Sequence, residues 1–229
     1  MKRAIFYDTE TTGINAEKDE IIEIAAYDPE RDASFEALIN PGRPIPAEAS
    51  AVHKITDDMV VGKPTFAEIG AQFAAFCEGE VVLIAHNNDG FDKHFLHHSF
   101  KRHQIHLPRF TYFDTLKWAR RYRPDLPRHN LQHLREVYGI EANNAHRALD
   151  DVIILAEVYK RMTDDLHIEL CLELLSTPRL IRTMPFGKHA GKPLNEVPKS
   201  YYAWLNEQGA FDKPDNAELK LALQKLNLI

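Results

Sequence analysis

The chain contains 229 residues, of which 44% are hydrophobic and 27% are charged, and its formal net charge is −6 at neutral pH. These values exclude a disordered or fibrous chain, and the apolar runs are too short to cross a bilayer. We therefore expect a globular protein of at most two domains that makes no membrane contact. The first residues lack the apolar core and cleavage site of a signal peptide, which predicts a cytoplasmic location.

The first half of the chain alternates strand patterns with one clear helix. Residues 65–77 place apolar side chains at helical spacing, and Thr65 with Glu68 has the sequence signature of a capping box. Residues 81–85 are apolar throughout, as in a strand covered on both faces, and they lead into a turn at residues 86–90. Apolar segments bounded by turn residues predict strands at residues 3–8, 21–27, 33–40 and 81–85.

The second half predicts a further strand and several helices before the composition changes. The strand is expected at residues 110–113, and the helices near residues 115–122, 130–138 and 148–162. Strands alternating with helices indicate a mixed α/β domain. The helical pattern stops near Pro178, and a basic segment punctuated by Gly and Pro follows, so we expect one domain at residues 1–177 and a small module at residues 178–229.

The two cysteines, Cys77 and Cys171, lie far apart on apolar segments that look helical. We expect buried thiols rather than a disulfide framework or a zinc site built from cysteine.

The acidic net charge does not exclude a nucleic-acid partner, because electrostatic attraction depends on where the charges lie. Residues 93–135 contain ten Lys or Arg residues against Asp114 and Asp125, and residues 178–202 contain five against one acid. Such runs can also be ordinary solvated faces, so they need support from the chemistry of a site.

Four acids supply that chemistry. Asp8 and Glu10 stand two residues apart at the end of the first predicted strand, so both carboxylates can face one cation. Asp92 begins a predicted helix, where an acid could also simply complement the helix dipole. Asp151 lies on the apolar face of another helix, and a carboxylate there is costly unless it is paired or binds a metal.

His146 precedes the helix that carries Asp151. An imidazole with an ordinary pKa near 6.5 suits a general base at neutral pH, although a chain with twelve histidines also places some of them on its surface.

Three segments together resemble the exonuclease motifs of the DEDDh, or DnaQ-like, superfamily. They are DTETTG at residues 8–13, AHNNDGFD at residues 85–92 and HRALDD at residues 146–151. Their order and spacing match the superfamily, and the similarity extends over residues 3–165. Many members have one residue fewer in the second segment, which affects the position of Asn87 more than the identity of Asp92.

The resemblance implies a ribonuclease H-like fold, with a mixed sheet of about five strands flanked by helices. It implies a 3′→5′ exonuclease that releases nucleoside 5′-monophosphates from DNA, in repair or turnover, with two Mg²⁺ or Mn²⁺ ions per active site and His146 as general base. The metal ligands that it implies are Asp8, Glu10, Asp92 and Asp151. The terminal nucleotide would be held by Thr11, Thr12, Ile14, His53 and Asn87.

The C-terminal segment resembles the short tail module of exonuclease X-like proteins, which favours DNA as the substrate. Gly187 and Gly191 could bring the backbone close to phosphate, and Lys188 and Lys192 would supply positive charge. The aromatic residues at 201, 202 and 204 could stack on bases or, equally, form the core of a small module.

Two related functions stay open beside the exodeoxyribonuclease. One is an exoribonuclease, because nothing in the sequence identifies a sensor of the 2′-hydroxyl group. The other is a proofreading, epsilon-like subunit or a purely binding subunit associated with a polymerase. The expected partner is therefore the 3′ end of DNA, with RNA or a polymerase under the alternatives.

Five histidines between residues 94 and 106 invite a zinc interpretation, but no clear set of Cys or acid partners accompanies them.

Overall fold

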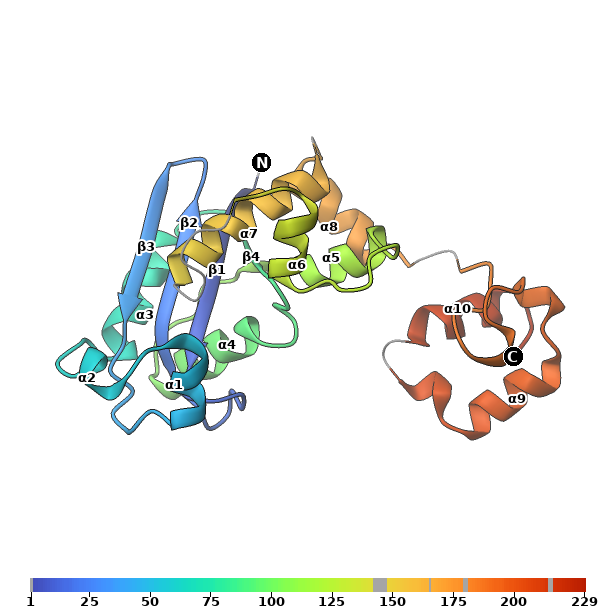
Figure 1. The fold of residues 1–229 in the computed structure, drawn as a ribbon, viewed down its shortest axis with the longest axis horizontal. Helices are drawn as coiled ribbons and strands as arrows, with labels where there is room; N and C mark the ends of the chain where they lie inside the picture. The colour runs from blue at the N-terminus through green and yellow to red at the C-terminus, as the bar shows by residue number, and fades with distance from the viewer. Residues whose placement is uncertain (1, 142–147, 165, 179–180, 214–215) are drawn as a thin grey trace. The chain divides into compact units, whose positions relative to one another are not determined.

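The computed structural model describes residues 2–141, 148–164, 166–178, 181–213 and 216–229. The chain divides into two compact units, Met1–Leu174 and Leu175–Ile229. Figure 1 shows the first as a sheet with flanking helices and the second as a small helical unit. No helix in the described ranges is long and apolar enough to cross a membrane.

The first unit is built on one five-stranded sheet with the order β3-β2-β1-β4-β5. Strand β1 pairs antiparallel with β2 and parallel with β4; β2 and β3 are antiparallel, and β4 and β5 are parallel. This arrangement confirms the predicted mixed sheet. The strands are β1 (Arg3–Thr11), β2 (Ile21–Asp28), β3 (Ala33–Leu38), β4 (Val81–Ala85) and β5 (Thr111–Asp114).

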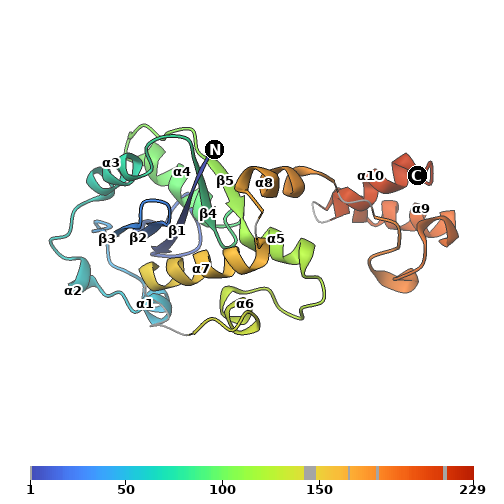
Figure 2. The same ribbon diagram turned by 90° about the horizontal axis from the view of Figure 1, so that it is seen from above.

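Helices cover both faces of the sheet: α7 lies across one face, and α3 and α4 lie on the other (Figure 2). The N-terminus of α3 carries the predicted capping box, in which the Thr65 N–H donates to Glu68 Oε2 at 2.9 Å. The short helices α1 and α2 were not predicted. The helices are α1 (Ala47–His53), α2 (Asp57–Val60), α3 (Phe66–Phe76), α4 (Asp92–Arg102), α5 (Thr115–Tyr122), α6 (Leu131–Val137), α7 (Ala148–Thr163) and α8 (Ile168–Ser176).

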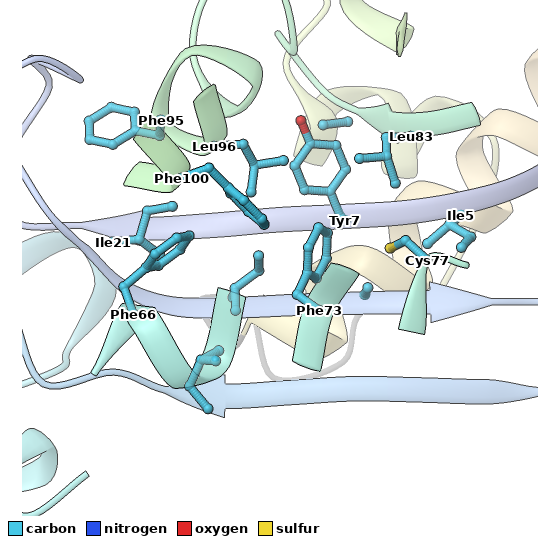
Figure 3. Close-up of a cluster of buried hydrophobic side chains, with 14 of the residues drawn as sticks. Ile5, Tyr7, Ile21, Phe66, Phe73, Cys77, Leu83, Phe95, Leu96 and Phe100 are labelled. Atoms are coloured by element: carbon cyan, nitrogen blue, oxygen red, sulfur yellow. The ribbon is translucent and has the colours of Figure 1, made fainter. Parts of the chain in front are cut away.

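Successive residues of β1 point to opposite faces, and this alternation positions the acids. Ile5 and Tyr7 belong to the core beneath α3 and α4 (Figure 3). Phe6 points the other way and packs edge-on against Tyr159 of α7, with ring centroids 5.3 Å apart. By the same alternation, Asp8 is on the α7 face of the sheet.

The two cysteines are free and buried, as predicted.

Asn88 links the ends of three strands. The Tyr7 hydroxyl donates to its Oδ1 at 2.6 Å, and its Nδ2 donates to the carbonyls of Leu83 and Phe113 at 3.1 and 3.0 Å. Both side chains are completely buried, so each polar atom depends on its partner within the protein. The turn after β4 is therefore fastened to β1, β4 and β5 together.

The second unit has its own small core. Met184, Leu194, Tyr202 and Phe211 are among its buried residues, and the Tyr202 hydroxyl donates to the Leu194 carbonyl at 2.8 Å. Its elements are η1 (Gly187–His189), η2 (Leu194–Glu196), α9 (Lys199–Glu207), η3 (Ala210–Asp212) and α10 (Ala217–Lys225).

We expect Tyr7→Phe to lower the free energy of unfolding by about 1–3 kcal/mol, because it leaves the buried Oδ1 of Asn88 without its donor. Urea unfolding followed by circular dichroism would measure the change. Tyr27→Phe is the matched control, since the Tyr27 hydroxyl makes only an exposed hydrogen bond to Asp32. Equal stability of Tyr7→Phe and wild type would contradict this account.

Candidate active site

The four acids predicted from the sequence come from three element boundaries of the first unit. Asp8 and Glu10 lie near the end of β1, Asp92 is the first residue of α4, and Asp151 lies in the first turn of α7. Their electrostatic influence on one another shows that the fold brings them together.

Burial and neighbouring carboxylates strongly perturb the two acids of β1. The pKa of Asp8 is raised well above its usual value, first by burial and then by Asp92, Glu10 and Asp151. Burial raises the pKa of Glu10 to about 7, with further contributions from Glu23, Asp151 and Asp92. Strand pairing thus holds together negative charges that repel one another.

Glu23 is a fifth acid, which the sequence reasoning missed. It is 3% exposed and lies directly opposite Glu10 in the pairing of β1 with β2. Like charges at opposed positions destabilise a sheet. A single acid within the otherwise apolar strand IIEIAAY was the signal that could have found it.

Thr9 holds Asp92 against β1. The backbone N–H of Thr9 donates to Asp92 Oδ1 at 3.1 Å, and its hydroxyl donates to the same oxygen at 2.8 Å. Burial raises the pKa of Asp92 to about 7, although the hydrogen bonds from Thr9 oppose the shift. The first turn of α4 is thereby fixed relative to the other acids.

Asp151 is half-buried on the face of α7 that the sequence predicted. Ala148, Leu155 and Tyr159 on this face are buried. Gln132 Nε2 donates to Asp151 Oδ1 at 3.4 Å. His146 lies outside the described residues, so its role as general base stays a prediction.

The donor set fits a divalent cation by its chemistry, since oxygen ligands with negative charge are those that Mg²⁺ and Mn²⁺ prefer. A cation would also relieve the repulsion that raises the pKa values of Asp8 and Glu10. Within the described ranges, however, no group of three or more His, Cys, Asp or Glu side chains is already arranged to hold a metal ion.

The structure separates the residues predicted to hold the terminal nucleotide into two groups. Thr11, Thr12 and His53 are buried, and the backbone of Thr11 influences the pKa of His53, which burial lowers. Ile14, in contrast, is 91% exposed on the loop after β1. Asn87 is exposed and adopts a left-handed backbone conformation, with φ of 70°.

Asn87 is folded into its own turn. Its N–H donates to Asp114 Oδ1 at 3.2 Å. Its side chain lies so close to Gly90 that a Cβ at that position would collide with it. Asn87 is thus held by contacts within the turn and with Asp114, while Asp92 lies among the acids.

Two arginines that the sequence reasoning missed fasten the loop that carries Ile14. Arg102, the last residue of α4, donates to the carbonyls of Asp19 and Ala16, both at 3.0 Å. It also pairs with Glu20 at 2.6 Å. Arg43 donates to Thr12 Oγ1 at 2.8 Å and to Asp19 Oδ1 at 3.0 Å.

A depression of about 500 Å³ lies between this loop and α4. Ile14, Phe91, His94 and His98 are among the residues that line it. His94 Nε2 is hydrogen-bonded to the Asp89 carbonyl at 2.9 Å, and His97 Nε2 to the Tyr112 hydroxyl at 3.1 Å. The zinc interpretation of these histidines finds no support in the part of the chain that the structure describes.

Two family models match the chain. One, described as Exonuclease, matches residues 5–159. The other, described as Putative quorum-sensing-regulated virulence factor, matches residues 176–224.

Several curated proteins are similar to this chain. The DNA polymerase III subunit epsilon of Treponema pallidum is 41% identical over 161 residues, which are 68% of this chain and 74% of that protein. The subunit epsilon of Aquifex aeolicus is 32% identical over 165 residues, 71% of this chain and 81% of that protein. The PolC-type DNA polymerase III of Latilactobacillus sakei is 39% identical over 150 residues, but the match spans 10% of that protein.

Solved structures share the fold. Exonuclease I of E. coli in complex with a dT13 oligonucleotide aligns with a TM-score of 0.66 and 22% identity, over 79% of this chain and 45% of that one. Exonuclease X in complex with 5′-overhanging duplex DNA aligns with a TM-score of 0.59 and 24% identity, over 76% of this chain and 99% of that one. These alignments confirm the predicted ribonuclease H-like fold.

We expect the metal-free protein to lose stability as the pH rises from about 4.5 to about 7. Because the pKa values of Glu10 and Asp92 are raised to about 7, the folded state retains protons that the unfolded chain releases in this range. Asp8→Asn places a side chain that cannot ionise among these carboxylates and should raise the free energy of unfolding at pH 7 by on the order of 1 kcal/mol.

Urea unfolding in a chelator at pH 5 and pH 7 would measure both effects. Asp58→Asn, at an exposed aspartate of α2, is the matched control. If Asp8→Asn were less stable than wild type at pH 7, repulsion among these acids would not be the dominant interaction.

We expect Arg102→Met to release the loop after β1, because it removes two hydrogen bonds and an ion pair. Hydrogen exchange of the amides at residues 15–19 should accelerate about tenfold or more. Arg109→Met, at an exposed arginine, should leave their exchange unchanged. Unaltered exchange in the Arg102 variant would mean that the loop is held by other contacts.

Proposed function

Because the chain belongs to the DnaQ-like exonuclease family whose model matches residues 5–159, we propose that it is a metal-dependent 3′→5′ exodeoxyribonuclease. It hydrolyses the terminal phosphodiester of DNA and releases a nucleoside 5′-monophosphate. The observation that carries this proposal is the group of mutually repelling carboxylates at the ends of β1, α4 and α7. Such a group serves phosphodiester chemistry when divalent cations neutralise it.

Asp8, Glu10, Asp92 and Asp151 would hold two Mg²⁺ or Mn²⁺ ions. Bound ions of this kind neutralise charge on the phosphate and make a water molecule more acidic. Thr9 keeps the Asp92 carboxylate oriented by two hydrogen bonds, so that this ligand is fixed before substrate arrives.

His146 takes the proton from the attacking water, since neutral imidazole is a base of suitable strength near pH 7. The backbone amides near Thr11 and Thr12, with Ile14 and His53, hold the terminal nucleotide. The exposed side chain of Ile14 is available for an apolar contact with a base. Asn87 completes this set, as the resemblance implies.

DNA is favoured as the substrate because exonuclease I and exonuclease X, which share the fold, have been solved with DNA oligonucleotides.

A second candidate function is proofreading in association with a DNA polymerase. The specific observation in its favour is the 41% identity with the DNA polymerase III subunit epsilon of Treponema pallidum. This role requires the same hydrolysis. Co-purification of the tagged full chain with a polymerase from its own cells would support it, and a fully active lone chain would favour an independent nuclease.

We expect the full chain to shorten a 5′-labelled DNA oligomer from its 3′ end in Mg²⁺ and to be inactive in chelator. A 3′-labelled oligomer should release labelled mononucleotide at once. His146→Ala should reduce the rate about 10²–10⁴-fold, the usual range for loss of a general base. His106→Ala, at an exposed histidine, should retain the wild-type rate.

Degradation of a matched RNA oligomer with DNA left intact would overturn the assignment of substrate. Full activity of the His146 variant would overturn the assignment of the base, and full activity of wild type in chelator would overturn the metal mechanism.

A further inference from the structure

Helix α9 carries two aromatic rings outside the fully buried core, the partly buried Tyr201 and the exposed Trp204. Tyr201 and Trp204 stand three residues apart, so they share one helix face. Their rings are stacked, with centroids 5.6 Å apart and planes 25° apart. Trp204 is 49% exposed, whereas Tyr202 between them is completely buried. Of the three aromatic residues considered from the sequence, Tyr202 therefore belongs to the core, Tyr201 is partly buried against that core, and Trp204 faces outward.

The glycine-containing loop at residues 184–193 packs against Tyr201 of this pair. Its ends are joined by hydrogen bonds from the Met184 N–H to the Lys192 carbonyl at 2.8 Å and from the Gly191 N–H to the Met184 carbonyl at 2.7 Å. Gly187 has φ of 75°, and a Cβ there would collide with the Tyr201 hydroxyl. Only glycine combines this backbone conformation with so close an approach.

The loop also brings positive charge to the rings. The ring centroid of His189 lies 4.7 Å from that of Tyr201. Burial and the charges of Lys192 and Lys188 lower the pKa of His189. Lys188 and Lys192 themselves are exposed. Aromatic rings and cations are thus gathered on one surface of the second unit.

We propose that Tyr201, Trp204, Lys188 and Lys192 form a binding surface for single-stranded DNA, hereafter the aromatic-basic patch. The rings would stack on unpaired bases, while the lysines would contact the adjacent phosphates. The partner is single-stranded because paired bases within a duplex do not present their faces to a stacking ring. The inference extends the proposed function, since it gives the second unit a role in holding the same substrate.

Charge complementarity supports a polyanionic partner. The segment 178–202 contains five basic residues and a single acid, Glu196, although the whole chain has a net charge of −6. Such a local excess of positive charge attracts a phosphate backbone irrespective of the net charge. Proteins that bind single strands usually combine such electrostatic attraction with stacking of bases on exposed aromatic rings, which tolerates any base sequence.

Binding of a fluorescein-labelled dT oligomer to the full chain, in chelator to prevent hydrolysis, tests the patch. Changing Tyr201 and Trp204 together to Ala should weaken the affinity about tenfold or more. Intrinsic tryptophan fluorescence provides a second readout: Trp204 should be quenched on binding, whereas Trp118 is 2% exposed and remains as a constant signal. The single variant Tyr201→Phe should retain near-normal affinity, since it keeps the ring.

The lysines are tested by the dependence of affinity on salt. Changing Lys188 and Lys192 to Gln should reduce the slope of log K against log salt by about 1.4, as expected for the loss of two phosphate contacts with a single strand. Lys213→Gln with Lys225→Gln, at exposed lysines of the same unit outside the patch, should leave the slope unchanged.

Wild-type affinity in the aromatic double variant would overturn the inference, as would the absence of Trp204 quenching when the wild type binds the oligomer. An equal loss of affinity for a blunt duplex in the double variant would overturn it too. Hydrolysis of the small substrate thymidine 5′-monophosphate p-nitrophenyl ester, which offers no second base, separates this result from the proposed function. The patch variants should hydrolyse it at the wild-type rate. If the wild type hydrolysed neither the ester nor the oligomer, the proposed nuclease function would be wrong. The binding measurement would still test whether the aromatic-basic patch binds single-stranded DNA.

Discussion

Negative charge is concentrated at the end of β1, and the rest of the first unit must hold these carboxylates close together. The pairing of β1 with β2 places Glu10 opposite Glu23, and Thr9 holds Asp92 beside them. Left to themselves, these carboxylates would separate or become protonated. The hydrogen bonds of the sheet and the packing of α4 and α7 hold them in place, so stability supplied by the core maintains a strained distribution of charge.

Much of this arrangement could be predicted because the relevant signals are local. The apolar run of β4, the spacing in α3 and the capping box of Thr65 and Glu68 each reflect contacts within one element. The four acids could be predicted because each stands at an element boundary in a recognisable order. His146 was predicted in the same way, but the described residues do not include it.

Other features depend on contacts that no local pattern reports. The position of Glu23 follows from the register between two strands, and neither strand specifies that register alone. Arg102 contacts carbonyls 83 and 86 residues earlier in the chain. The helices α1 and α2 contain seven and four residues, too few to establish a 3.6-residue period. On α9, Tyr202 is fully buried, whereas its neighbour Tyr201 is partly buried and contacts the loop at residues 184–193.

Helix α4 begins with Asp92 and ends with Arg102, and this has a mechanical consequence. Eleven residues of α-helix form a stiff rod about 16 Å long. One end holds a carboxylate against β1, and the other holds the loop that carries Ile14. Because a single stiff element spans both contacts, the length of α4 sets the spacing between the carboxylate and the anchor of the loop.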